Sequence, residues 1–189
     1  MKKIILYIPL LILSIIFTGC SDDNPPAPVN EEELITTMIV TLSPSSGGTD
    51  ITLKYTDMDG NGNDDPTIDI SGNLTAGAIY NCSIELLDES DANDVENITE
   101  EVQEEANEHQ FFYTIGTGLD VTTTYDDEDG NGNPIGIEFK LTANSSSSGD
   151  LSFTLRHKPN KSATGVASGD ITNAGGDTDI TATFPISVE

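Results

Sequence analysis

The chain has 189 residues, of which 33 are aspartate or glutamate and seven are lysine or arginine, so its formal net charge at neutral pH is −26. Binding to nucleic acid needs a basic surface, and this composition excludes it. Two cysteines allow at most one disulfide, which excludes a disulfide-rich scaffold. Without a short N-terminal segment, about 170 residues remain, enough for one domain with a single core.

The N-terminal segment has the features of a bacterial signal peptide. Two lysines precede an almost wholly apolar run over residues 4–17, which is too short to span a bilayer as a permanent helix. The run ends in Thr-Gly-Cys at residues 18–20, which resembles the lipobox of lipoproteins. We therefore expect residues 1–19 to be removed and Cys20 to be lipidated. The alternative is an ordinary secretory signal followed by an incidental cysteine.

The residues after the lipidation site predict a tether and a location. An acidic pair at residues 22–23 resembles the surface-export signal of Bacteroidetes lipoproteins, so we expect a lipid-anchored protein on the outer face of the outer membrane. Residues 24–30 are rich in proline and polar side chains, which favours a semi-extended linker. The predicted organisation is a signal peptide, a lipidated cysteine with its tether at residues 20–33, and one domain at residues 34–189.

From residue 34 onward, apolar and polar residues alternate, which is typical of half-buried strands. The clearest segments lie at residues 38–42, 51–55, 80–86, 121–125, 135–141, 151–155 and 180–188. Eight or nine such strands predict an all-β fold, an antiparallel, Ig-like β-sandwich around one core. Cys82 is in phase with the apolar side of its segment, so we expect a buried free thiol.

One segment departs from this alternation. Residues 94–109 place four apolar side chains three or four positions apart, from Val95 to Ala106. Asn97 is a suitable N-cap, and the acidic residues that follow it favour a helix N-terminus. We predict one amphipathic helix across an end or edge of the sandwich, with its glutamate-rich side in solvent.

An internal repeat surrounds this helix. Residues 55–63 recur at residues 125–133, and both copies contain the sequence DxDGNGN. An alternating strand precedes each copy, and another strand follows it after a proline. The simplest interpretation is a duplicated unit of strand, strand, loop, strand, strand, with pseudo-symmetry and the helix between the halves.

The two DxDGNG loops are candidate calcium sites. The second copy matches the pattern D-x-[DN]-x-[DN]-G-x5-E, in which alternate oxygen-bearing side chains converge on an ion that needs six to eight oxygens. The candidate ligands are Asp127, Asp129, Asn131 and Glu138 in the second copy, and Asp57, Asp59, Asn61 and Asp65 in the first. The alternative is a pair of plain hairpin loops, in which glycine and asparagine only permit the turn.

The two histidines are candidate transition-metal ligands. His109 is predicted at the end of the helix, and His157 continues the apolar phase at the end of a strand. If these ends meet, the two imidazoles and a carboxylate such as Glu105 or Glu108 suit Zn²⁺, Cu²⁺ or Fe. The alternative is a pair of structural histidines.

A small basic group interrupts the acidic sequence. Arg156, Lys158 and Lys161 open the longest predicted loop, residues 158–178, and long loops in compact domains are often functional. These side chains either hold an anionic ligand or pair internally with the glutamate-rich helix.

Enzymatic motifs are missing from the sequence. We find no G-x-S-x-G, no H-E-x-x-H and no phosphate-binding glycine loop. Acidic pairs for glycoside chemistry are plentiful in so acidic a chain, but nothing singles one out. We therefore predict a protein that is not an enzyme.

Four stretches carry a resemblance to a known family. They are ELITTMIVTL at residues 33–42, the DxDGNGN loops, ITEEVQEEANEHQFFY at residues 98–113 and LRHKPNKSATGVASGDITNAGGDTDI at residues 155–180. With them, the chain resembles small lipoproteins of Flavobacteria and other Bacteroidetes, often labelled type 1 periplasmic binding fold superfamily proteins and found beside TonB-dependent receptors. That label implies two α/β lobes, whereas the alternation in this chain predicts strands almost throughout.

Together these features predict a lipid-anchored binding module of the outer-membrane surface. Its expected role is to capture a ligand or metal for a TonB-dependent transporter, the partner that the resemblance implies. The alternative is a structural or adhesive surface protein whose loops are made rigid by calcium.

Overall fold

The computed structural model describes residues 34–58 and 65–189, which form ten strands, one α-helix and two short 3-10 helices. The predicted signal peptide, Cys20 and the tether lie outside the described residues. The strands are β1 (Thr37–Pro44), β2 (Ile51–Thr56), β3 (Thr67–Ile70), β4 (Ile79–Asp88), β5 (Glu96–Asn97), β6 (His109–Ile115), β7 (Val121–Tyr125), β8 (Glu138–Ala143), β9 (Ser147–His157) and β10 (Asp177–Val188). The helices are α1 (Ile98–Glu104) and the 3-10 helices Val166–Ser168 and Ile171–Asn173.

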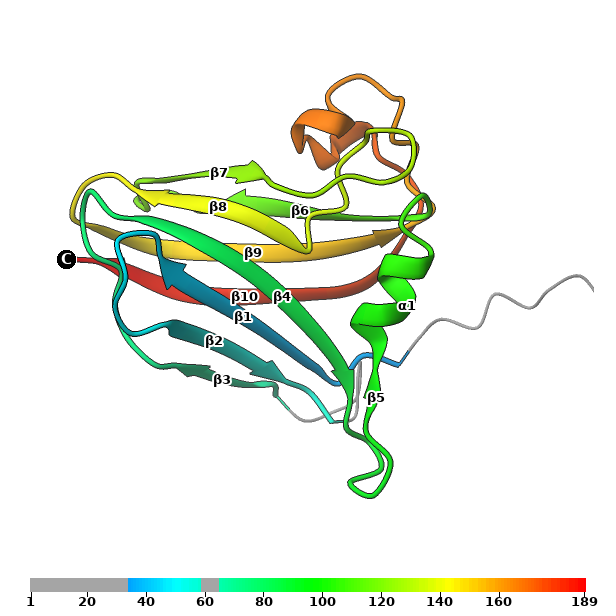
Figure 1. The fold of residues 1–189 in the computed structure, drawn as a ribbon, viewed down its shortest axis with the longest axis horizontal. Coiled ribbons are helices and arrows are strands. Elements are labelled where there is room, and N and C mark those ends of the chain that lie inside the picture. Colours follow the sequence, from blue (N-terminus) through cyan, green and yellow to red (C-terminus); the bar gives the residue numbers. More distant parts are fainter. Residues whose placement is uncertain (1–33, 59–64) are drawn as a thin grey trace, which may run out of the picture. The chain divides into compact units, whose positions relative to one another are not determined.

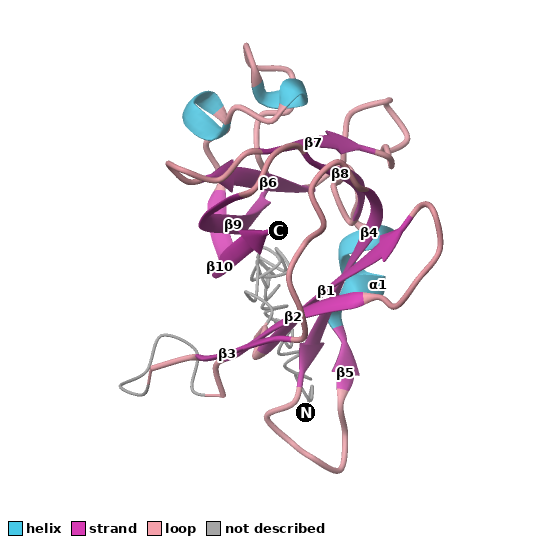
Figure 2. Cartoon of the chain, turned by 90° about the vertical axis from the view of Figure 1, so that its left-hand side faces the viewer, coloured by secondary structure: helices cyan, strands magenta, loops and turns pink. Residues whose placement is uncertain are grey.

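The strands form two antiparallel sheets (Figure 1). The larger sheet has the order β3-β2-β1-β4-β8-β7, with β5 added beside β4, and the smaller sheet has the order β10-β9-β6. Figure 2 shows β3 at one edge of the larger sheet and β7 at the other. The predicted all-β sandwich is confirmed. The described residues contain ten strands rather than eight or nine, because β5 is only two exposed residues long and carries no alternation.

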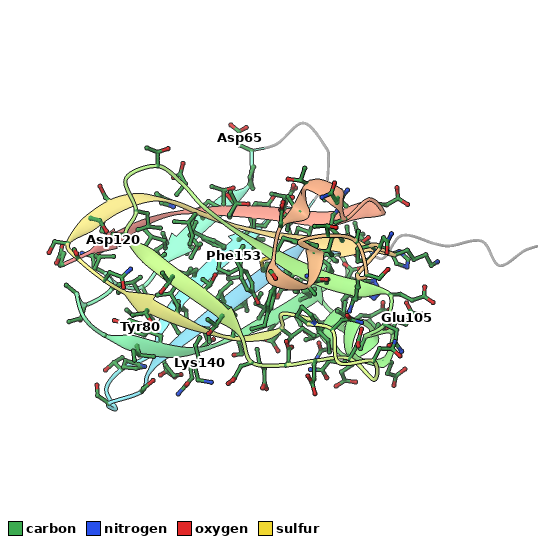
Figure 3. All side chains as sticks on the ribbon, turned by 90° about the horizontal axis from the view of Figure 1, so that it is seen from above. Asp65, Tyr80, Glu105, Asp120, Lys140 and Phe153 are labelled. Carbon is green, nitrogen blue, oxygen red and sulfur yellow. The ribbon has the colours of Figure 1, made fainter. Side chains whose placement is uncertain are left out.

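The core lies between the sheets and follows the predicted alternation. In β4, every second residue from Tyr80 to Leu86 is buried, and the intervening residues are exposed. Phe153 of the smaller sheet contacts Phe139 of the larger sheet, with ring centroids 5.8 Å apart. Figure 3 shows Phe153 inside the molecule, whereas Asp65 and Asp120 project outward. Burial of one such phenylalanine contributes about 1.5–3 kcal/mol to stability.

The helix is shorter than predicted. It spans Ile98–Glu104 rather than residues 94–109, with Asn97 as the expected N-cap, whose side chain accepts a hydrogen bond from the Thr99 N–H. It starts late because Glu96 and Asn97 pair with β4. It ends early because glutamates repeat four residues apart and repel, and negative charge is unfavourable near a helix C-terminus. No helix among the described residues has the length and apolarity needed to cross a membrane.

The predicted repeat matches the strand pairing only in part, because β1 pairs with β2 whereas β6 and β7 lie in different sheets. In the first half β1 pairs with β4 and β2 with β3; in the second half β6 pairs with β9 and β7 with β8. The two DxDGNG copies therefore connect β2 to β3 and β7 to β8, at opposite edges of the larger sheet. The described core draws only on residues from Ile35 to Val188, so a chain starting at residue 21 contains the whole described fold.

The thiol of Cys82 should be unreactive in the folded protein. The side chain is buried, and burial raises its pKa to about 12, so almost no thiolate is present at pH 8. In the chain from residue 21, we expect slow labelling by a disulfide reagent such as DTNB under native conditions and complete labelling in denaturant.

A matched variant places the thiol on the other face of the same strand. Ser83 is exposed, so Ser83→Cys in a Cys82→Ala background should react at once without denaturant. Rapid native labelling of Cys82 itself would contradict the burial described above.

Candidate functional site

Two histidines meet at one end of the smaller sheet. His109 is the first residue of β6, His157 is the last residue of β9, and the strand register places them directly opposite each other. Their rings stack with centroids 4.6 Å apart and an interplanar angle of 14°. Both residues are buried, with 4% and 7% of their surface exposed. The condition under which the sequence makes these histidines candidate metal ligands, that the two ends meet, is therefore fulfilled.

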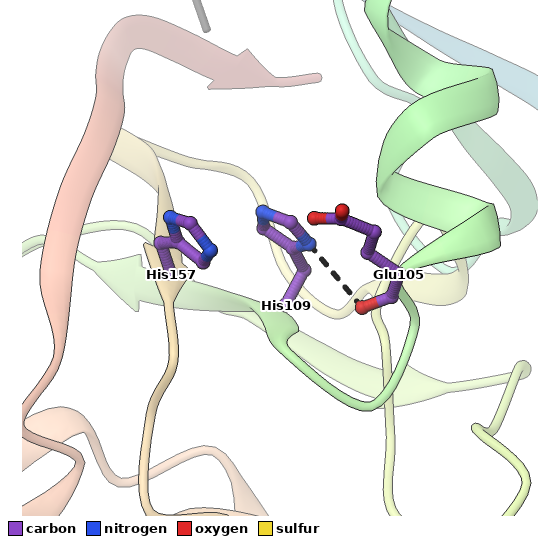
Figure 4. A group of neighbouring side chains, drawn as sticks. All are labelled: Glu105, His109 and His157. Carbon is purple, nitrogen blue, oxygen red and sulfur yellow. Dashed lines mark hydrogen bonds between the residues drawn. The ribbon is translucent and has the colours of Figure 1, made fainter. Parts of the chain in front are cut away.

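Carboxylates surround the histidine pair. Glu105, His109 and His157 each offer a ligand atom, and these three atoms lie within 4.8 Å of one another. Figure 4 shows the Glu105 side chain beside His109, on the side away from His157. The carboxylate of Asp179 lies 3.7 Å from His109 Nε2 and 4.0 Å from His157 Nδ1. Glu108 Oε2 lies 3.8 Å from His157 Nε2.

His109 does not end the helix as predicted, but it still contacts the helix C-terminus. Its Nδ1 lies 3.3 Å from the backbone oxygen of Glu105, which caps α1. Because a carbonyl oxygen only accepts, this contact requires a proton on Nδ1 and leaves the lone pair on Nε2. Burial lowers the pKa of His109 and the neighbouring His157 lowers it further, which favours the neutral ring.

The arrangement suits a transition metal. Neutral imidazole nitrogens are common ligands of zinc, copper and iron, and carboxylates frequently complete such sites. A metal-binding histidine usually donates its second N–H to a carbonyl or carboxylate, as His109 does to Glu105. Glu105, His109 and His157 are the one such group found among residues 34–58 and 65–189.

The sequence did not single out Asp179. In the structure its side chain is only 5% exposed. In β10, Thr178 pairs with Arg156 and Ile180 with Leu155, so Asp179 is an extra residue in a β-bulge. Strict alternation with Ile180 would direct Asp179 outward, and the bulge instead places it beside the histidines. A bulge of this kind leaves no signal in the alternation pattern.

The aspartates of the second DxDGNG loop have protein partners. Both oxygens of Asp127 accept backbone hydrogen bonds, from the N–H groups of Gly136, Ile137 and Glu138, at 2.7–2.9 Å. The Glu138 side chain is exposed at the start of β8. Asn131 donates its backbone N–H to Asp129. Calcium binding at this copy stays a prediction, and an ion would compete with these hydrogen bonds.

The ammonium of Lys161, which belongs to the segment after β9, is buried against this second loop. Lys161 Nζ donates to Asp129 Oδ2 at 3.0 Å, to the Pro134 oxygen at 3.0 Å and to the Ala106 oxygen at 2.6 Å. The two charged side chains are 6% and 0% exposed. Burial raises the pKa of Asp129, but hydrogen bonds from the Asn133 N–H and from Lys161 outweigh it and hold the pKa below its ordinary value.

Only part of the first loop is described. Asp59 and Asn61 lie outside the described residues. Asp65 is exposed, and Asp57 accepts a hydrogen bond from the Tyr55 hydroxyl at 3.3 Å. Calcium binding at this copy also stays a prediction.

The predicted basic group is paired internally. Arg156 donates to the backbone oxygen of Gly175 and to the Thr178 hydroxyl. Lys158 Nζ lies 3.4 Å from Glu108 Oε2, just after the helix. Lys161, the third basic residue, is buried against Asp129 of the second DxDGNG loop. All three basic side chains therefore contact the protein itself, which favours the internal-pairing alternative over an anion site.

Comparison with known proteins finds no matching family model, no similar curated protein and no similar solved structure. The function is therefore argued below from the site and the sequence.

The Lys161 contact should carry a large part of the stability of this end of the fold. Lys161→Met would leave the buried carboxylate of Asp129 without its cation, and loss of one partner of a buried pair costs about 3–5 kcal/mol. We expect urea denaturation of the chain from residue 21 to show a loss of this size.

Lys140→Met is the matched control. Lys140 pairs with Asp126 near the same loop, but the two side chains are 42% and 48% exposed. An exposed pair contributes at most about 1 kcal/mol. Equal losses from the two lysine variants would contradict the special role of Lys161. Addition of Asp129→Asn to Lys161→Met should recover part of the lost stability.

Proposed function

We propose that this protein is a lipid-anchored module of the outer-membrane surface that captures a divalent transition metal, without enzymatic activity, for a TonB-dependent transporter. The observation that carries the proposal is the stacked pair of buried histidines with Glu105 beside it. The lipobox-like sequence ending in Cys20, the acidic residues after it and the family resemblance support the location and the partner.

The charge of the chain supports cation capture. An acidic protein raises the local concentration of cations near its surface and speeds their association. Five exposed glutamates lie on α1 and the turn after it, and the last two of them are beside the histidine pair: Glu100, Glu101, Glu104, Glu105 and Glu108. Such a surface favours encounter with the ion, while the two imidazoles supply selectivity over Ca²⁺ and Mg²⁺, which prefer oxygen ligands.

Metal titration tests the proposal directly. The chain from residue 21 should bind one Zn²⁺ in isothermal titration calorimetry, and 100 times the dissociation constant should stabilise it by about 2.7 kcal/mol. The chain contains only two histidines, so His109→Ala with His157→Ala removes every imidazole. We expect the double variant to lose binding by about 100-fold or more, because both nitrogen ligands are gone.

Two neighbouring glutamates give a matched control. Glu105→Gln should weaken Zn²⁺ binding by more than about 100-fold, because it removes a carboxylate ligand close to both rings. Glu104→Gln, one residue earlier at the end of α1, should leave the affinity unchanged. Wild-type affinity in the double histidine variant would refute the site.

A further inference from the structure

We propose that Asp179 is a direct ligand of the captured ion, so that the site has two imidazole nitrogens and two carboxylates, from Glu105 and Asp179, and is suited to Zn²⁺. This inference rests on the proposed metal capture and adds a fourth ligand, Asp179, to the proposed site.

The backbone of β10 delivers Asp179 to the histidines. The bulge between Thr178 and Ile180 inserts one residue into the ladder with β9, opposite Arg156 and Leu155. Bulges re-aim single side chains and are frequent beside functional sites. Here the bulge places a carboxylate that is 5% exposed against both rings.

The distances fit ligands of one ion. Asp179 lies 3.7 Å from His109 Nε2 and 4.0 Å from His157 Nδ1, which is longer than a hydrogen bond. With bonds of about 2.0–2.2 Å, two ligands of a tetrahedral zinc lie about 3.3 Å apart. Small side-chain movements therefore bring all three groups onto one ion. His109 offers Nε2 to Asp179 because its Nδ1 donates to the Glu105 backbone.

A polar cavity gives an ion room beside Asp179. The cavity has a volume of about 300 Å³ and is lined by Asp179 together with Tyr55, Asp57, Thr178 and Thr181, among others. Asp57 Oδ1 is buried and accepts no hydrogen bond from the described residues. Two carboxylates, from the end of β2 and from β10, thus border one cavity, which favours the approach of a hydrated cation to Asp179.

The donor set selects among ions. Two nitrogens and two carboxylate oxygens suit a borderline ion such as Zn²⁺ in tetrahedral geometry, whereas Ca²⁺ takes oxygen ligands only and Cu⁺ prefers thiolates and thioethers. Cys82 is the one cysteine in the described residues, and it keeps its proton because burial raises its pKa to about 12. The described residues therefore offer no thiolate for Cu⁺.

The first test compares two aspartates of the same strand. Loss of a residue that only orients a ligand weakens metal binding by about 10- to 100-fold. Asp179→Asn should therefore reduce Zn²⁺ affinity by more than about 100-fold, measured against a competing chelator in the chain from residue 21. Asp177→Asn changes an exposed aspartate two residues earlier and should leave the affinity unchanged.

The second test detects contact with the metal and does not depend on affinity. Asp179→Cys with Co²⁺ should show a sulfur-to-cobalt charge-transfer absorption, which appears only if residue 179 touches the ion. Asp177→Cys should show none, and Cys82 in the wild type serves as the background. Native melting curves for each variant show whether the fold is retained.

The outcomes separate the two proposals. If Asp179→Asn binds Zn²⁺ as wild type does and Asp179→Cys gives no charge-transfer band, Asp179 is not a ligand, while loss of binding in the double histidine variant still supports metal capture. If the wild type binds neither Zn²⁺ nor Co²⁺, both proposals are wrong.

Discussion

The buried ammonium of Lys161 joins three segments that are distant in the sequence. Its contacts with Ala106, Asp129 and Pro134 tie the loop after β9 to the turn after α1 and to the second DxDGNG loop. Ala106 follows Glu105 directly and lies three residues before His109. The positions of Glu105 and His109 therefore depend on this one cation, because it holds the turn between them. The chain has few basic residues, and one of them, Lys161, stabilises this end of the fold.

The sequence predicts most of the fold because most strands face solvent on one side. The alternation is clear in β4 and β10, where buried and exposed residues follow each other closely. In β6 it fails: His109, Gln110, Phe111 and Phe112 are all buried. The outer face of β6 is covered by the segment after β9, where Phe112 packs against Val166 and Ala174. A strand buried on both faces has no period of two to detect.

The candidate site was predictable in part. The phase of His157 with Leu155 and Phe153 indicates an inward imidazole, and the acidic segment before His109 indicates nearby carboxylates. The direct pairing of the two histidines depends on the register of β6 and β9, which no local pattern specifies. Asp179 depends on a bulge, and Lys161 on a contact across 32 residues of sequence. Both are products of tertiary structure.

The open edge of β3 has a consequence for crowding. β3 ends the larger sheet, and no strand of the described chain lies along its outer edge. It is four residues long and carries Asp69 between two partly buried isoleucines. Short length and a central charge discourage edge-to-edge pairing. Proteins held by lipid in one membrane plane meet each other in two dimensions at high density, as we propose for this chain. There, mutual repulsion between strongly acidic neighbours would keep such edges apart and leave each copy free to meet the transporter that we propose as its partner.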